Sequence, residues 1–244
     1  MIPLGVFVTG TDTGVGKTVV ACELIRGLRG RGIETGVIKP IETGVGADGP
    51  ADAIALRHAC GARDPIGDVC PQQFRLPAAP SVAAAAAGRR VDLSAITTAY
   101  ERVRRGCDFV VAEGAGGLLV PIDDRFDMLD LARELRLPAL LVARAALGTI
   151  NHTRLSLEVA RQRGLEVVGV VISHADGVLT AADAANLAAL RELLDDRLLG
   201  EMLPRTDDPD GSMDAAGDPA LVEQEPLIDL DRLLLGLQAL SAAD

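Results

Sequence analysis

The sequence predicts an α/β fold with a doubly wound, mostly parallel sheet and helices flanking both of its faces. Short apolar runs alternate along the chain with longer amphipathic stretches, as strands and helices do in such folds. Runs such as Val167–Ile172 are apolar on both faces, which is typical of parallel strands covered by helices on either side. No linker or internal repeat is evident, so residues 1–244 are predicted to form a single domain.

The predicted elements follow in order along the chain. The apolar runs are predicted to be strands at Leu4–Thr9, Thr35–Lys39, Cys107–Glu113, Pro138–Ala143 and Glu166–Ser173. Pro40 ends the second of these, because proline cannot donate to a sheet ladder. The amphipathic stretches are predicted to be helices at Thr18–Arg31, Ala51–Ala59, Leu93–Arg105, Met128–Leu135, Ile150–Arg163, Ala181–Leu194 and about Ile228–Leu240. Two segments are interpreted as irregular, an insertion over the active-site edge at Gly61–Gly88 and an exposed loop at Asp207–Asp218.

Composition limits the classes of partner. Hydrophobic residues make up 48% of the chain, which excludes a disordered protein. A formal net charge of -11, no tryptophan and one tyrosine argue against nucleic acid, which needs a basic surface or stacking aromatics. The four cysteines form no C-x-x-C pair, so zinc is not expected, and free thiols suit a reducing cytoplasm. No signal peptide or membrane-spanning run is recognisable, so a cytoplasmic protein without a membrane partner is expected.

The strongest chemical signal is the glycine-rich segment Gly10–Thr18, which directly follows the first predicted strand. A loop of small residues can point its backbone N–H groups at phosphate oxygens, and the positive end of the next helix faces the same place. Lys17 is predicted to reach the β- and γ-phosphates, and Thr18 to place its hydroxyl on Mg²⁺. The usual motif has glycine where this chain has Thr11. The segment predicts a fold of the P-loop NTPase type that binds ATP with Mg²⁺.

Further motifs accompany this loop in order: Lys39–Gly44, Glu113–Gly117, Leu147–His152 and, more weakly, Gly200–Pro204. Together with Thr9–Thr18, including Thr11, they resemble the motifs of the dethiobiotin synthetase family, from Val8 to about Pro204. The resemblance implies an ATP-dependent enzyme of biotin biosynthesis. Such an enzyme joins CO2 to 7,8-diaminononanoate through a carbamate and a carbamic–phosphoric anhydride, and closes a cyclic urea.

The resemblance also implies roles for individual residues. Lys39 is expected to act with Lys17 as a catalytic cation, placed on the γ-phosphate and the substrate carbamate, where charge develops during transfer. Mg²⁺ is expected on Thr18, Asp52 and Glu113. The nucleotide is expected to contact Thr13, Gly14, Val15, Gly16, Lys17, Thr18, Val19, Glu113, Gly116 and Pro204.

The residue types alone leave a structural alternative open at three of these positions. Lys39 could be a surface lysine at a turn. Asp52 lies where a helix is predicted to start and could complement the helix dipole. Glu113 could be a strand-end acid facing solvent, although the carboxyl end of a parallel strand is also where such sheets bind ligands.

Two more segments are implied to hold the diamine. Thr43 is expected to hydrogen-bond it, with a turn-forming threonine as an equal alternative. A turn that begins a predicted helix has unpaired N–H groups, which are expected to hold the substrate carboxylate across a homodimer interface so that the two active sites are shared. His152 after this turn is interpreted as a capping or packing residue. The turn consists of Gly148, Thr149, Ile150 and Asn151.

Some positions depart from patterns found in members of the family. Gly14 stands where some members carry an acidic residue, and Asn186 where some carry a tyrosine near the substrate carboxylate. The segment Ser173–Asp176 lacks the Asn-Asp pair that reads adenine in some members. These departures leave nucleotide-base selectivity and substrate affinity open.

Two other classes of P-loop protein are alternatives to this enzyme. A partition-type switch ATPase usually carries a lysine where this chain has Asp12. An amidotransferase-type synthase needs a glutaminase domain with a catalytic cysteine, for which a chain of 244 residues has no room. Dependence of phosphate release on the diamine and bicarbonate would separate the ligase from a switch.

Overall fold

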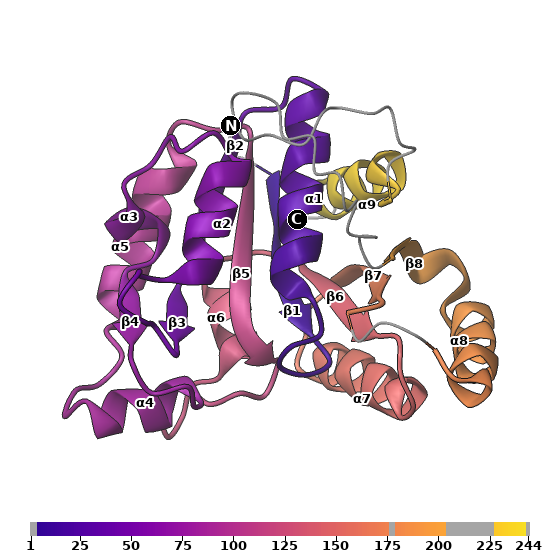
Figure 1. Ribbon diagram of the computed structural model, residues 1–244. Helices are drawn as coiled ribbons and strands as arrows, with labels where there is room; N and C mark the ends of the chain where they lie inside the picture. The colour runs from indigo at the N-terminus through magenta and orange to yellow at the C-terminus, as the bar shows by residue number, and fades with distance from the viewer. Residues whose placement is uncertain (1–3, 176–178, 204–226, 243–244) are drawn as a thin grey trace, which may run out of the picture.

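The structure is a computed structural model that describes residues 4–175, 179–203 and 227–242. Its centre is a six-stranded sheet with the order β2-β5-β1-β6-β7-β8, in which every neighbouring pair is parallel (Figure 1). The chain extends from β1 to one edge of the sheet and, after β5, to the other edge, so the predicted doubly wound fold is confirmed. The strands are β1 (Leu4–Gly10), β2 (Thr35–Ile38), β5 (Phe109–Gly117), β6 (Ala139–Arg144), β7 (Val167–Ser173) and β8 (Leu198–Met202).

Helices cover both faces of this sheet, and in Figure 1 α1 and α2 lie in front of it while α6 lies behind. One face packs on α1 (Lys17–Gly30), α2 (Ala51–Ala59) and α9 (Leu230–Ser241). The other face packs on α5 (Leu93–Arg104), α6 (Met128–Glu134), α7 (Thr149–Gln162) and α8 (Ala181–Leu194). The short 3-10 helix η1 (Asp195–Arg197) joins α8 to β8.

The two-sided burial follows from the alternation of side chains along a strand. In β1, Val6 and Val8 enter the core under α1, whereas Phe7 enters the core on the other face. In β5, Val111 enters the core under α1 and Ala112 enters the core on the other face. All five side chains are fully buried, which is why these runs read as continuously apolar in the sequence.

The region around the predicted insertion contains more regular structure than the sequence indicated. A second, small sheet forms from two parallel strands, β3 (Ile41–Thr43) and β4 (Gln72–Phe74). Two short helices, α3 (Ile66–Val69) and α4 (Pro80–Ala86), flank β4 along the chain. Strands of three residues are too short to show a period of two, so the sequence gives no signal for them.

The C-terminal part also differs from the prediction at one point. Leu198–Met202, for which no strand was predicted, form the edge strand β8, which includes the first three residues of the weakly matching segment Gly200–Pro204. Gly200 interrupts the apolar run of β8, so the run does not read as a strand. Pro204 and the predicted loop Asp207–Asp218 lie outside the described residues. Among the helices that are described, none is both long and apolar enough to cross a membrane.

The parallel strands place several chain segments at one edge of the sheet, where their carboxyl ends meet. Val8 of β1 pairs with Glu113 of β5, and Ile38 of β2 pairs with Ala112. Lys39, the residue after β2, therefore lies beside Glu113, directly below the loop that follows β1. This edge carries the candidate site.

Candidate active site

The glycine-rich loop connects β1 to α1, with Gly16 as the residue that caps the helix. Gly14 and Gly16 have φ angles of 72° and 90°, in the left-handed region that favours glycine. A Cβ atom on Gly16 would lie 2.3 Å from Ser173 Oγ at the end of β7. Val15 is buried between them and anchors the loop, while Thr13, Gly14 and Val19 are exposed. The loop is therefore a tight turn that needs glycine at these two positions, and its outer residues face solvent.

The glycine run at the end of β5 supports this loop. A Cβ atom on Gly116 would lie 3.3 Å from Thr13 Oγ1, and one on Gly117 would lie 3.0 Å from the carbonyl oxygen of Gly10. Larger residues there would push the loop away from the sheet. The run that follows Glu113 is therefore explained by close packing against the loop as well as by ligand contact.

A buried ionic cluster lies below the loop. Lys39 is 3% exposed, and its Nζ atom lies 2.8 Å from Asp52 Oδ2 and 2.5 Å from Glu113 Oε1. The Thr18 hydroxyl donates to the same Glu113 oxygen at 2.9 Å. Glu113 is fully buried, so Lys39 and Glu113 do not take the surface positions that the sequence left open. Asp52 does lie in the first turn of α2, and it also contacts Lys39.

The charges of this cluster depend on one another. Burial alone would lower the pKa of Lys39, but Glu113 and Asp52 outweigh it and raise that pKa above its ordinary value. Burial would likewise raise the pKa of Asp52, and the Lys39 ammonium lowers it instead. Lys17, whose Nζ donates to the carbonyl of Asp12 at 3.0 Å, has its pKa lowered to about 8 by burial and by the charge of Lys39. Lys17 and Lys39 are the only lysines in the sequence.

We expect these two lysines to titrate separately. A protein labelled with ¹³C-lysine should show two Cε signals, because the chain contains two lysines. One signal should titrate near pH 8, well below the ordinary lysine value of 10.5, and the other should stay protonated over that range. Lys17→Arg should remove the first signal and retain the second. Two signals that both titrate at the ordinary value would contradict the buried cluster.

The same titration has a consequence for nucleotide affinity. Phosphate contact favours the charged form of Lys17, which is lost as pH rises through its pKa of about 8. Apparent affinity for ATP should therefore fall as pH rises above that value. Lys17→Arg should show a weaker pH dependence, because a guanidinium stays protonated.

The residues present fit a magnesium ion. Glu113 Oε2 is buried and has no hydrogen-bond partner in the part of the chain that the structure describes. A carboxylate oxygen without a partner is costly in a protein interior unless a ligand satisfies it. Mg²⁺ prefers oxygen ligands from one or two carboxylates together with phosphate oxygens. Thr18, Asp52 and Glu113 supply such oxygens side by side.

The turn that was predicted to bind the substrate carboxylate lies at the start of α7. Gly148 caps the helix with a φ of 92°, and the buried Thr149 Oγ1 has no hydrogen-bond partner among the described residues. Thr149 lines a hollow of about 70 Å³ together with Thr11 and Asp12 of the same chain. Ile150 is half-buried and packs on the core beneath α8, and Asn151 is exposed. His152 lines the same hollow from the exposed side of α7.

The other predicted positions are distributed around this edge. Thr43 ends β3 and is half-buried. Ser173 packs against Gly16, and His174 is buried, with its Nε2 atom 3.0 Å from Glu201 Oε2 on β8. His174 therefore joins the ends of β7 and β8, a contact that the sequence did not reveal. Glu42 and Arg144 were also missed, and the Arg144 guanidinium donates to the carbonyl of Thr13 at 3.0 Å.

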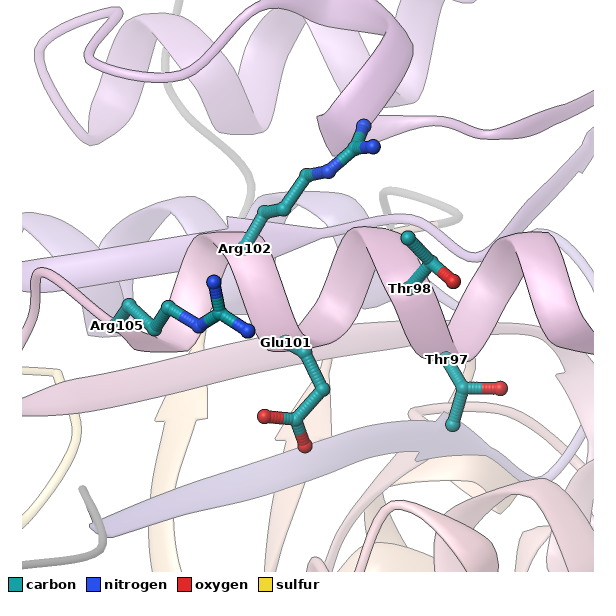
Figure 2. Close-up of a pocket in the computed structure, with 5 residues that line it drawn as sticks. All are labelled: Thr97, Thr98, Glu101, Arg102 and Arg105. Carbon is teal, nitrogen blue, oxygen red and sulfur yellow. The ribbon is translucent and has the colours of Figure 1, made fainter.

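A separate surface hollow of about 310 Å³ lies on α5 and is shown in Figure 2. Its lining side chains come from α5 and from Arg105, which caps the C-terminal end of that helix, and Arg102 among them pairs with Asp68 at 2.9 Å. None of the site residues lines it. The lining residues are Thr97, Thr98, Glu101, Arg102 and Arg105.

The parallel sheet, the glycine-rich loop before α1 and the buried Glu113 within β5 define a P-loop, ATP-binding domain. Comparison with known proteins agrees, because a family model described as an AAA domain matches residues 4–209. A protein from Borrelia burgdorferi assigned to plasmid partition, solved with AMPPNP, has a TM-score of 0.52 at 11% identity over 98% of this chain and 99% of that one. At that identity the likeness shows the fold alone.

Sequence relatives give the family. The ATP-dependent dethiobiotin synthetase BioD of Anaeromyxobacter dehalogenans strain 2CP-C is 46% identical over 189 residues, which cover 76% of this chain and 85% of that protein. The protein of the same name from Aquifex aeolicus is 41% identical over 170 residues, or 70% of this chain and 76% of that protein. The chain belongs to the ATP-dependent dethiobiotin synthetase family. It is an enzyme of that family, a ligase of biotin biosynthesis that uses ATP with Mg²⁺.

Proposed function

We propose that this chain carries out the family's reaction with Lys39 as the cation at the reacting groups: carboxylation of 7,8-diaminononanoate with CO2 and ring closure to dethiobiotin. The buried Lys39, held between Asp52 and Glu113 beside the phosphate loop, is the observation that supports this most directly. A buried lysine that stays protonated can stabilise two anionic groups that approach each other beside it. In this reaction those groups are a carbamate and the γ-phosphate of ATP.

The reaction needs positioning and charge more than covalent catalysis. One amine adds to CO2 and loses a proton, which gives a carbamate. A carbamate oxygen then attacks the γ-phosphorus, the bond to ADP breaks, and a carbamic–phosphoric anhydride remains. The second amine attacks the carbonyl carbon, expels phosphate and loses a proton, which completes the cyclic urea. Because that amine is tethered to the reacting carbon, ring closure gains from high effective concentration.

Each part of the site has a place in this scheme. The loop N–H groups and Lys17 would hold the phosphates, with Val15 keeping the loop in shape. Lys39 would stabilise charge on the oxygen that bridges the carbamate and the phosphorus. Thr18, Asp52 and Glu113 would hold Mg²⁺, which neutralises charge on the phosphate oxygens when bound. Lys17 and Lys39 are therefore the proposed catalytic residues.

For the diamine, we assign the turn Gly148–Asn151 to the substrate carboxylate and Thr43 to an amine or carbamate group. The N–H of Thr149 donates to the carbonyl of Ala146 at 3.2 Å, but the first turn of a helix has further N–H groups without a partner inside the helix. These groups and the Thr149 hydroxyl, which has no partner among the described residues, suit an anion. We further propose a homodimer in which this turn serves the partner's site. The free thiols of Cys22, Cys60 and Cys70 are compatible with the cytoplasm, where we expect the enzyme to act.

The proposed function predicts coupled chemistry. With ATP, Mg²⁺ and ¹³C-bicarbonate, addition of the diamine should strongly stimulate phosphate release. Mass spectrometry should find dethiobiotin with one ¹³C, in amounts equal to the phosphate. Equal phosphate release with and without the diamine would instead indicate a switch ATPase. The shared site is tested by the same assay over a dilution series, in which specific activity should fall as the dimer dissociates.

A further inference from the structure

Glu42 is a buried acid that the proposed chemistry does not use. It lies at the centre of β3, is 6% exposed, and has both carboxylate oxygens turned toward the start of α2. Oε1 accepts a hydrogen bond from the N–H of Asp52 at 3.1 Å, and Oε2 accepts one from the N–H of Ala53 at 3.0 Å. These two amides belong to the first turn of α2, where backbone N–H groups have no partner within the helix.

Helix α2 needs such a partner from elsewhere. Its N-cap residue is Pro50, which has no hydrogen-bonding side chain. A carboxylate that accepts two backbone N–H groups at a helix start also complements the positive end of the helix dipole. Glu42, on the neighbouring strand β3, therefore accepts the hydrogen bonds that a serine or aspartate at the N-cap position usually accepts.

The capped turn carries Asp52. The backbone N–H of Asp52 is bound to Glu42, while its carboxylate reaches Lys39 and its side chain is 43% exposed. Lys39 and Thr18 hold the tip of that side chain, and because packing does not enclose it, its position also depends on the backbone from which it projects. Glu42 fixes that backbone, and β3 also carries Thr43.

We propose that Glu42 is a positioning residue for the magnesium site, acting through Asp52. The inference rests on the proposed function, because it takes Asp52 as a metal ligand. Partners of metal ligands usually affect affinity by roughly 10–100-fold when they are replaced. Glu42 should belong to this group, because its carboxylate binds the backbone of the proposed ligand Asp52 and is not itself one of the proposed ligands.

The test measures metal binding directly. Mn²⁺ binding is followed by EPR in the presence of saturating non-hydrolysable ATP analogue, for wild type, Glu42→Gln and Glu42→Ala. Asp92→Ala is the matched control, because Asp92 caps α5 by accepting a hydrogen bond from the N–H of Ala95. Asp92 lines neither of the two hollows described above and is not part of the Lys39 ionic cluster. Thermal unfolding is recorded for every variant.

We expect Glu42→Ala to weaken Mn²⁺ binding by about 10-fold or more, and Glu42→Gln by a smaller factor, since glutamine keeps one acceptor oxygen. Asp92→Ala should lower the unfolding temperature and leave Mn²⁺ binding unchanged. Loss of stability in both Glu42 variants with unchanged Mn²⁺ affinity would show a merely structural cap. The same Mn²⁺ shift in Asp92→Ala would also overturn the proposal, since the assay would then report stability.

A double-mutant comparison tests the route through Asp52. In an Asp52→Asn background, Glu42→Gln should have little further effect on Mn²⁺ binding, because the ligand that it positions has been replaced. The full single-variant effect in that background would mean that Glu42 acts by its charge or by another contact, against the proposal. An Asp52→Asn variant with wild-type Mn²⁺ affinity would overturn the metal-ligand assignment itself. Absence of dethiobiotin formation by wild type would overturn the proposed function separately.

Discussion

Replacing Lys39 with alanine is expected to lower kcat by about 10²–10³-fold, the usual effect of removing one contact to charge that develops in a transition state. Lys39 lies below the loop and donates to Asp52 and Glu113, whereas Lys17 donates to the loop itself. The KM for ATP should therefore change little in Lys39→Ala. In Lys17→Ala, the KM for ATP should rise and kcat should fall. The measurement is steady-state phosphate release at saturating diamine and bicarbonate.

The Lys39 experiment needs a check on folding, because the substitution leaves a fully buried Glu113 without its cation. Breaking a buried ion pair typically costs about 3–5 kcal/mol. Lys39→Gln is the second variant, since its amide can still donate to Glu113 but carries no charge. If charge is what matters, both variants should lose kcat to a similar degree while Lys39→Gln unfolds nearer to wild type. A kcat within a few-fold of wild type in the folded variants would remove the catalytic role of Lys39.

Gly16→Ala is expected to weaken ATP binding by at least about tenfold and to destabilise the protein. Its φ of 90° costs a residue with a side chain roughly 1–3 kcal/mol, and the added Cβ would lie 2.3 Å from Ser173 Oγ. Relief of that contact must move the loop, whose N–H groups are proposed to bind phosphate. Each charge-assisted hydrogen bond lost is worth about 1.5–3 kcal/mol, or tenfold and more in affinity.

Gly30→Ala at the other end of α1 is the matched control. A Cβ atom there would meet no described atom within 4 Å, and the residue is helical. The same substitution should therefore leave ATP binding unchanged and should not lower the unfolding temperature. Titration calorimetry with ATP and thermal unfolding give both quantities. Unaltered ATP affinity in Gly16→Ala would show that the phosphate does not bind at this turn.

The parts of the fold that the sequence predicted are those with a local signature. The strands of the main sheet other than β8 were predicted because their side chains are buried on both faces, which forces a continuous apolar run. The phosphate loop was predicted because its shape needs glycines at particular positions. Strands β3 and β4 were missed because three residues carry no period, and β8 because Gly200 breaks its run.

The candidate site also has features that the sequence predicted and features that only the tertiary structure revealed. The sequence by itself indicated that Lys39 and Glu113 lie near the carboxyl edge of the sheet, because each ends a predicted strand, although β5 continues past Glu113 to Gly117. Only the tertiary structure decided that Lys39 is buried against Glu113, 74 positions away, and not exposed at a turn. The contact depends on β2 and β5 being neighbours, which no local pattern specifies. Glu42 is the extreme case, because its role exists only where β3 meets the first turn of α2.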